Sequence, residues 1–323
     1  MFVLGLQGSP RIKGNTSTLL SAFLTQAEGL GARTHQVHVA RQNISPCLEC
    51  GTCEQEGFCP IDDDMQGVYP LLWQADIIVM ATPVFFYGPT AQMKALIDRT
   101  QALWARRYVH KLADPGRKRR HGFLLSLGAT RGKNLFDGVK LTAKYFFDAV
   151  GANFEGSLTY RQIEAQGDVA GHPTAFNDAK EQAGCLVTPL LNRKKVLFAC
   201  TDNACRSQMA SAFAQHLAGD RIEAESAGRS PAEEVHPLME EVMAEKGIDM
   251  AFRNPKSLEE AGRRVGTPDL IITMGCGEVC PFFPGVPSQA WDLPDPSGQS
   301  IAFMRQVRDD IEGRVKKLAK DDW

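Results

Sequence analysis

A cysteine and an arginine in the last third of the chain have the spacing of a nucleophile site that binds an oxyanion. Residues 200–207 read Cys-Thr-Asp-Asn-Ala-Cys-Arg-Ser and follow an apolar run that begins at Val196. A loop between a strand and a helix directs backbone N–H groups at an anion, and Arg206 adds a bidentate donor. The same positive field favours the attacking thiolate of Cys200, to which Ser207 can donate a hydrogen bond. The other residues predicted to line this site are Thr201, Asp202, Asn203, Ala204 and Cys205.

An aspartate far downstream has the setting of a general acid. It lies in the segment Trp291-Asp-Leu-Pro-Asp295-Pro296, where the Asp-Pro pair holds the carboxyl group on a rigid loop. The alternative interpretation of these residues is a buried structural Cys200 with Arg206 on the surface of a helix. The strand, loop, helix and Asp-Pro pair together favour the catalytic interpretation.

These segments, together with Glu225-Ser-Ala-Gly228 and Asp269-Leu-Ile-Ile-Thr-Met-Gly-Cys276-Gly-Glu-Val-Cys280, resemble the thiol-dependent arsenate reductases. That family shares the fold of the low-molecular-weight tyrosine phosphatases, and the resemblance covers nearly all of residues 194–323. It implies that Cys200 attacks arsenate, that Arg206 and the loop amides bind its oxygens, and that Asp295 protonates the departing oxygen.

Two further cysteines separate a reductase from a phosphatase. The resemblance implies that Cys276 and Cys280 are the redox pair and that thiolate attack on the Cys200–arsenic adduct releases arsenite and leaves a disulfide. The gap between them is narrower than in many thioredoxin-coupled members, and Met-Gly-Cys-Gly resembles enzymes served by a small thiol. Phosphatases usually carry an aromatic residue where this chain has Ser297. Which cysteine resolves the adduct stays open, as does a signalling phosphatase with a redox-sensing flavin domain.

A second anion site is predicted near the N-terminus. Residues 8–17 read Gly-Ser-Pro-Arg-Ile-Lys-Gly-Asn-Thr-Ser and join an expected strand to an expected helix. Small residues and hydroxyls at a helix N-terminus suit a phosphate, although an ordinary capped turn is the alternative. The segment has neither the Gly-Lys-Ser/Thr ending of an NTPase loop nor the Gly-x-Gly-x-x-Gly of a dinucleotide fold.

Two more loops, residues 82–88 and residues 126–130, follow strands at the same expected sheet edge, where open α/β sheets bind ligands. With residues 8–17 they resemble the flavodoxin-like NAD(P)H-dependent FMN reductases over roughly residues 1–165, a family that often builds its flavin site across subunits. The resemblance implies FMN and a homo-oligomer. Its phosphate would be held by Ser9, Arg11, Asn15, Thr16 and Ser17. The flavin ring would contact Pro83, Val84, Phe85, Phe86, Tyr87, Ser126 and Gly128.

Four cysteines are spaced as Cys47-x2-Cys50-x2-Cys53-x5-Cys59-Pro60. This run is close to that of bacterial ferredoxins and differs in its last gap. It resembles the iron–sulfur flavoproteins, which implies a [4Fe–4S] cluster beside FMN. The alternatives are four free thiols in a capping loop, or zinc.

Two α/β units must position these residues. Expected strands at 2–7, 37–39, 76–81 and 123–127 alternate with expected helices at 16–30, 90–103 and 135–150. After a helix that ends near 191, the pattern restarts with a strand at 196 and another at 269–273. Strands that alternate with helices predict parallel sheets. We therefore expect a flavodoxin-like domain over residues 1–191 and a low-molecular-weight phosphatase-like domain over residues 192–323.

Composition limits the remaining functions. The 323 residues carry a net charge of -2, which gives no reason to expect nucleic acid or a membrane as partner. No apolar run is long enough to span a bilayer, and no basic segment precedes the first apolar run, so a cytoplasmic location is expected. The basic run at 106–120 suggests a solvated loop, a nucleotide phosphate site or a contact for acidic ferredoxin. The tandem arrangement suggests that electrons from NAD(P)H or ferredoxin, rather than from thioredoxin or a small thiol, regenerate the reductase. The other rival is a non-enzymatic electron carrier.

Overall fold

The computed structural model describes residues 1–275 and 283–320. Contacts between Cα positions divide the chain into two compact units. The N-terminal unit comprises residues 1–111 and 119–191, and the C-terminal unit comprises residues 112–118 and 192–323. Each unit is built on a parallel sheet of its own, which confirms the predicted fold class.

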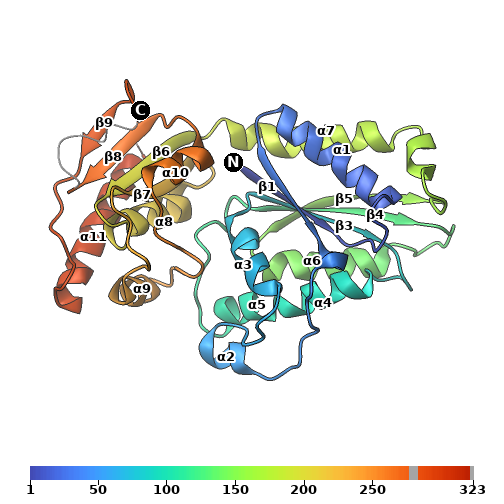
Figure 1. Cartoon of the computed structure of the whole chain (residues 1–323), viewed down its shortest axis with the longest axis horizontal. Coiled ribbons are helices and arrows are strands. Elements are labelled where there is room, and N and C mark those ends of the chain that lie inside the picture. Colours follow the sequence, from blue (N-terminus) through green and yellow to red (C-terminus); the bar gives the residue numbers. More distant parts are fainter. Residues whose placement is uncertain (276–282, 321–323) are drawn as a thin grey trace. The chain divides into compact units, whose positions relative to one another are not determined.

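The sheet of the N-terminal unit has five parallel strands in the order β2-β1-β3-β4-β5 (Figure 1). Their bounds are β1 Phe2–Gln7, β2 Arg33–His38, β3 Ile77–Pro83, β4 His121–Gly128 and β5 Asn153–Arg161. This is the strand order of flavodoxin-like folds, in which ligands bind beyond the carboxyl ends of the strands. The loops that follow β1, β3 and β4 therefore share one edge.

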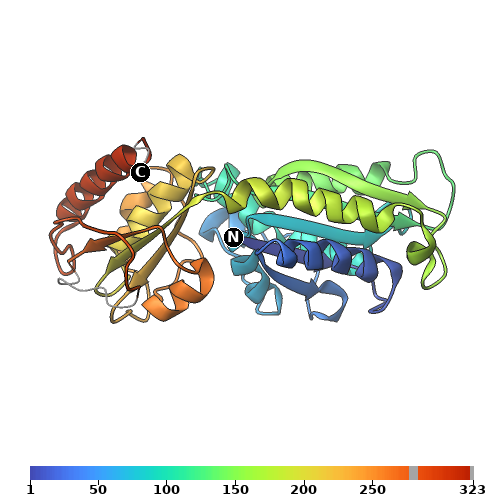
Figure 2. The ribbon, with the colours of Figure 1, turned by 90° about the horizontal axis from the view of Figure 1, so that it is seen from above.

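Helices cover both faces of this sheet. On one face, α1 (Asn15–Gly29) and α7 (Ala175–Leu191) run side by side (Figures 1 and 2). On the other face lie α3 (Met65–Gln74), α4 (Ala91–Arg99), α5 (Gln101–Tyr108) and α6 (Asp137–Ala149). Short helices occupy Val39–Arg41, Thr52–Glu56 (α2) and Asp168–Gly171. Leu20, Phe23 and Ala27 recur at helical spacing and bury one stripe of α1 against the sheet.

The C-terminal unit has four parallel strands in the order β7-β6-β8-β9. Their bounds are β6 Lys194–Cys200, β7 Ile222–Gly228, β8 Leu270–Met274 and β9 Ser288–Ala290. Its helices are α8 (Arg206–Ala218), α9 (Pro237–Ala244), α10 (Leu258–Val265) and α11 (Ile301–Leu318). Val196 and Phe198 of β6 pack in the core with α8, α9 and α11, whereas Leu197 packs with α10 on the opposite face. This alternation follows the two-residue period of a strand.

A segment from the middle of the chain belongs to the C-terminal unit. Ala113 donates its backbone N–H to the carbonyl oxygen of Gly247 at 2.7 Å and accepts from the N–H of Asp249 at 2.9 Å. Nothing in the sequence of residues 112–118 indicated this pairing.

Several elements differ from the expected ones, and three of them are in the N-terminal unit. Strand β5 was not predicted, because it is an edge strand whose side chains are mostly half-buried or exposed and lack an apolar run. Helix α3 was missed because Pro70 lies inside it. The single helix expected at 90–103 is two helices, α4 and α5, which divide at Thr100, whose hydroxyl donates to the carbonyl oxygen of Ile97 at 2.6 Å.

Among residues 1–275 and 283–320, no helix combines the length and apolar character that crossing a bilayer requires.

Candidate functional site

Strand β6 ends at Cys200 and helix α8 begins at Arg206, so the predicted nucleophile loop lies between a central strand and a helix N-terminus. The sulfur of Cys200 is 3.0 Å from the hydroxyl oxygen of Ser207 and accepts the backbone N–H of Asn203 at 3.2 Å. The Cys200 side chain is buried at the base of the loop. The structure thus brings Cys200, Ser207 and Arg206 together, as the spacing predicts.

Asn203 determines which atom is the donor in the hydrogen bond between Cys200 and Ser207. Its side-chain amide donates to the hydroxyl oxygen of Ser207 at 2.7 Å. A serine hydroxyl that accepts this bond keeps its single proton for another acceptor, and the sulfur of Cys200 is within reach. The backbone of Asn203 is left-handed, with φ of 50°, which asparagine tolerates better than most residues. The sequence indicated Asn203 only as a lining residue, not as the group that orients Ser207.

The segment 229–236 fixes the orientation of the loop peptides. Backbone N–H groups of this segment donate to the carbonyl oxygens of Cys200 (3.2 Å), Thr201 (2.9 Å), Asp202 (2.9 Å) and Ala204 (3.1 Å). In a trans peptide the carbonyl and the following N–H point in opposite directions. Carbonyls tied to the outer segment therefore leave the next N–H groups directed to the inside of the loop, where an oxyanion needs donors.

Two predicted lining residues, Cys205 and Thr201, have surroundings that the structure defines. Burial, followed by the neighbouring Cys200, raises the pKa of the Cys205 thiol to about 12, so this thiol stays neutral. The hydroxyl of Thr201 donates to the carbonyl oxygen of Gly275 at 3.3 Å.

Arg206 is held by the segment that carries the predicted general acid. Its Nη2 donates to Oδ2 of Asp295 at 3.0 Å, and its Nη1 donates to the carbonyl oxygen of Leu293 at 3.3 Å. Burial disfavours the charged form of Asp295, but hydrogen bonds from Ser297 and the Arg206 guanidinium outweigh it and lower the pKa of this carboxyl. In this state Asp295 is an ionised partner of Arg206. A bound oxyanion would compete for the guanidinium and bring negative charge beside the carboxylate, which raises the pKa of an acid.

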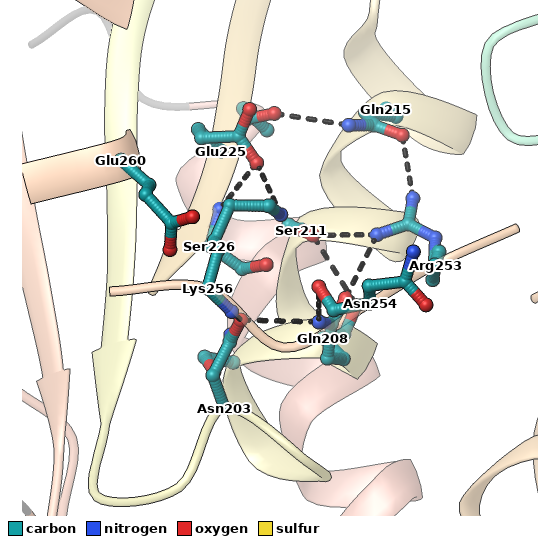
Figure 3. A network of polar contacts seen from close by, with 12 residues as sticks. Asn203, Gln208, Ser211, Gln215, Glu225, Ser226, Arg253, Asn254, Lys256 and Glu260 are labelled. Carbon is teal, nitrogen blue, oxygen red and sulfur yellow. Dashed lines mark hydrogen bonds and ion pairs between the residues drawn. The ribbon is translucent and has the colours of Figure 1, made fainter. Parts of the chain in front are cut away.

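A buried polar network supports the loop from behind (Figure 3). Its centre is the ion pair between Lys256 and Glu225, whose Nζ and Oε1 atoms are 2.9 Å apart. Burial would raise the pKa of Glu225, but Lys256 and Arg264 outweigh it and hold that pKa at about 2. The backbone N–H of Lys256 donates to Oδ1 of Asn203 at 2.9 Å, and Gln208 Nε2 donates to the same oxygen at 3.1 Å. The network therefore fixes the amide that orients Ser207.

The predicted redox cysteines, Cys276 and Cys280, lie outside the described residues. The residues before them are described: Met274 is in register with Cys200 across the β6–β8 ladder. Gly275 follows with φ of 72°, and a Cβ atom there would lie 2.6 Å from Nη1 of Arg206. Gly275, the last described residue before the two cysteines, therefore lies at the edge of the anion loop.

The three N-terminal loops line one cavity of about 270 Å³. Eight of the residues predicted to bind FMN line it: Ser9, Arg11, Asn15, Thr16, Pro83, Val84, Phe85 and Gly128. Leu127, Ala129, Ile163 and Glu164 also line it and were not predicted. The last two follow β5, the strand that the sequence did not reveal.

The other four predicted FMN contacts are not among its lining residues. Ser17 is half-buried in the first turn of α1. Ser126 is buried and donates to the carbonyl oxygen of Thr82 at 2.9 Å, which ties β4 to β3. Phe86 and Tyr87 are exposed, with φ of 48° and 66°.

Asn15, which lines this cavity, also contacts the loop after β5. Its Nδ2 donates to the carbonyl oxygen of Ala165 at 2.7 Å, and its Oδ1 accepts the N–H groups of Gly167 (2.9 Å) and Val169 (3.3 Å). Asn15 thus anchors the loop after β5. The N-terminus of α1 itself fits a phosphate, because its N-cap, Gly14, makes no side-chain cap and its first turn holds no acidic residue.

The four cysteines of the Cys47–Cys59 run line a second cavity, of about 570 Å³. Among the described residues, no group of His, Cys, Asp or Glu converges closely enough to hold a single metal ion. Four thiols around a cavity suit a cluster in which each binds a different iron. Arg99 also lines this cavity, and its Nε is buried without a hydrogen-bond partner. Four thiol donors and one buried cation fit an anionic iron–sulfur cluster.

Comparison with known proteins identifies a family for each of the two units. Residues 1–131 match the model of the NADPH-dependent FMN reductase family, and residues 195–321 match the low-molecular-weight phosphotyrosine protein phosphatase family. An iron–sulfur flavoprotein of Methanosarcina thermophila is 31% identical over 60% of this chain and 100% of its own length. Arsenate reductase 1 of Bacillus cereus is 36% identical over 40% of this chain and 96% of its own length. The chain spans about half (53%) of an iron–sulfur flavoprotein of Methanocaldococcus jannaschii, at 39% identity.

The two folds and their sites define an oxidoreductase in two parts. The chain belongs to the iron–sulfur flavoproteins in its N-terminal part and to the arsenate reductases of the low-molecular-weight phosphatase fold in its C-terminal part.

Proposed function

We propose that the protein reduces arsenate to arsenite at Cys200, with electrons supplied through its own flavin domain. The observation that supports this most directly is the chain of contacts from Asn203 through Ser207 to the Cys200 sulfur, at 2.7 and 3.0 Å. Hydrogen bonds to a thiolate stabilise the form that attacks. Arsenate is a tetrahedral oxyanion, and the loop amides and Arg206 suit its oxygens.

The proposed reaction has two steps at arsenic. The Cys200 thiolate forms a bond to arsenic(V), and one arsenic–oxygen bond breaks as that oxygen leaves with a proton from Asp295. A second thiolate, from Cys276 or Cys280, then attacks the Cys200 sulfur. The sulfur–arsenic bond breaks with its electron pair on arsenic, which leaves as arsenite. The two thiols are oxidised to a disulfide and arsenic(V) is reduced to arsenic(III), so two electrons balance.

The ionisation state of Asp295 before substrate binds determines where the proton for the departing oxygen comes from. With its pKa lowered, the carboxyl group is ionised before substrate enters. A monoprotonated arsenate can bring the proton that Asp295 then returns to the departing oxygen. When Arg206 gives up its hydrogen bond to Asp295 and binds the anion instead, the carboxylate becomes free to accept that proton.

The N-terminal unit is proposed to regenerate the thiols. FMN bound in the cavity of the three loops would supply both two-electron and one-electron transfer. The N-terminus of α1, with Ser9, Arg11 and Thr16, would hold its phosphate, and Pro83, Val84 and Phe85 would contact its ring. Cys47, Cys50, Cys53 and Cys59 would hold a [4Fe–4S] cluster.

NAD(P)H or ferredoxin is the proposed electron donor, and thioredoxin or a small thiol is the alternative. A cytoplasmic homo-oligomer is the proposed state.

Anaerobic assays with the whole chain test this proposal. Arsenite should form when NAD(P)H or reduced ferredoxin is the only reductant, and Cys276→Ser or Cys280→Ser should abolish turnover. If neither donor supports turnover but thioredoxin or a small thiol does, the electrons do not come from the flavin domain. Hydrolysis of an aryl phosphate that Cys276→Ser and Cys280→Ser leave unchanged would instead identify a phosphatase.

A further inference from the structure

Arg99, the last residue of α4, is a fully buried cation beside the four-cysteine cavity. Its Nη1 donates to the carbonyl oxygen of Ser45 at 3.0 Å and to Oδ2 of Asp63 at 2.7 Å. Its Nη2 donates to the carbonyl oxygen of Ile61 at 3.2 Å and to Oδ1 of Asp63 at 3.1 Å. One guanidinium therefore makes four hydrogen bonds, all of them to the chain that flanks the cysteine run.

These contacts join the two ends of the cysteine run. Ser45 lies two residues before Cys47, and Ile61 lies two residues after Cys59. Asp63 completes the closure, because its Oδ2 also accepts the backbone N–H of Ser45 at 2.8 Å. The side chains of Arg99 and Asp63 are 0% and 3% exposed, so solvent does not weaken this pair as it weakens a surface ion pair.

The closure is anchored to the core of the N-terminal unit. Tyr69 of α3 is buried and donates its hydroxyl to the carbonyl oxygen of Arg99 at 2.7 Å. Between the closed ends, α5 also holds the run, because Nη1 of Arg106 donates to the carbonyl oxygen of Gly57 at 3.2 Å. Cys47 and Cys50 are exposed, and Cys53 and Cys59 are half-buried. The ends are therefore fixed by a buried ion pair while the thiols remain accessible.

We propose that Arg99 is the positioning residue of the four-cysteine loop: with Asp63 it closes both ends of the loop before any cluster binds. A loop whose ends are already fixed loses less chain entropy when its thiols converge on a cluster. Arg99 also lines the cavity, and its buried Nε has no hydrogen-bond partner, so the positive charge of this guanidinium lies beside the thiols that would bind the cluster. This inference rests on the proposed cluster for its purpose, but the closure itself involves only residues of this chain.

The test compares Arg99→Lys with Lys94→Met in the full-length protein. Lysine keeps the positive charge but cannot make the forked pair of bonds to Asp63. Lys94 lies on the same helix in an exposed pair with Asp98, so its replacement controls for the loss of a helix ion pair. Metal-free protein is titrated anaerobically with ferrous iron and sulfide, and bound iron is measured. Backbone hydrogen exchange at residues 43–63 is measured separately on the metal-free chain.

We expect Arg99→Lys to lower the apparent affinity for the cluster about 10- to 100-fold, as for other residues that support metal ligands. The amide of Ser45 should exchange faster in the metal-free variant, whereas Lys94→Met should match the wild type in both measurements. Unchanged exchange and unchanged iron binding in Arg99→Lys would overturn the inference.

Two other outcomes are separable. If the wild type binds no iron, the proposed cluster fails, and exchange at Ser45 alone decides whether Arg99 closes the loop. If Arg99→Lys does not fold, Asp63→Asn removes the negative charge of the same ion pair, and iron binding and hydrogen exchange are measured on that variant instead.

Discussion

The side chain of Ser207 links the buried framework of the C-terminal unit to the sulfur that would react. The Asn203 amide donates to the Ser207 hydroxyl, and the Ser207 proton is left to donate to the Cys200 sulfur; all three residues lie between the end of β6 and the first turn of α8. The direction of the donors matters, because a hydroxyl free to rotate would stabilise the thiol and the thiolate alike.

The first prediction removes the hydroxyl of Ser207. Ser207→Ala should lower arsenate kcat/KM about tenfold to 100-fold, because one hydrogen bond to the thiolate is lost. Alkylation of Cys200 by iodoacetamide at pH 7 should also be slower than in the wild type, because the thiolate loses a hydrogen-bond donor. Ser288→Ala, at an exposed position of β9, is the control and should keep the wild-type rates. Identical alkylation rates for Ser207→Ala and the wild type would contradict this role of Ser207.

Glu225 gives a second prediction at the residue scale. Its folded-state pKa, about 2, lies below the ordinary value of 4.5, so the ionised carboxylate stabilises the fold above pH 4.5. This contribution should be lost as pH falls from about 4.5 to about 2, and by linkage it is on the order of 3 kcal/mol.

Denaturant unfolding between pH 2 and 7 measures this effect. Glu225→Gln should be less stable than the wild type at pH 7, since Lys256 is left buried without its partner, and the difference should shrink toward pH 2. A difference that stays constant over this range would show that Glu225 is not ionised in the folded protein.

At the scale of elements, the end of β8 constrains the anion loop. Gly275 has a left-handed backbone, and a Cβ atom there would lie 2.6 Å from Arg206 Nη1. Gly275→Ala should displace the guanidinium and lower arsenate kcat/KM about 100-fold, the cost of a small misplacement at a reacting centre. Gly285→Ala is a matched control, since Gly285 also has a left-handed backbone, with φ of 80°, but open space around its Cβ position. Equal losses in the two variants would assign the effect to backbone strain alone.

The loop after β5 gives the matching prediction for the N-terminal unit. Asn15 holds this loop through Ala165, Gly167 and Val169, and Ile163 and Glu164 of the same loop line the predicted flavin cavity. Asn15→Ala should weaken FMN binding about tenfold, because it releases the loop that lines the cavity. Fluorescence titration with FMN measures the effect, and Asn134→Ala in the loop before α6 is the control. Unchanged affinity would show that the loop does not depend on Asn15.

At the scale of the whole molecule, the covalent connection between the units has a kinetic consequence. If each flavin domain regenerates the reductase domain of its own chain or assembly, turnover per chain should not depend on protein concentration. Electron transfer between separate molecules would make turnover per chain rise in proportion to concentration. Arsenate turnover with NAD(P)H, measured over a 100-fold dilution series, distinguishes the two. Proportional dependence would contradict a role for the fusion in electron transfer.

The sequence by itself determined the two α/β folds and placed the groups that are predicted to react in one loop. Periodic apolar runs fixed most strands and helices, and the spacing of Cys200, Arg206 and Ser207 lies within one loop, where local geometry is enough to bring them together. The same holds for the residues of the three flavin loops, since the carboxyl ends of parallel strands share one edge.

Only the tertiary structure decided which residues support those groups. Lys256 reaches Asn203, Arg99 reaches Ser45 and Asp63, and Asn15 reaches the loop after β5 through contacts between residues distant in sequence. Such contacts leave no periodic pattern, because each depends on the register of the sheet and on the burial of one polar side chain. Strand β5 was missed for the related reason that an edge strand needs no apolar run. The spacing of residues in the sequence therefore indicates which groups share a loop, whereas the residues that hold those groups in place are determined by tertiary packing.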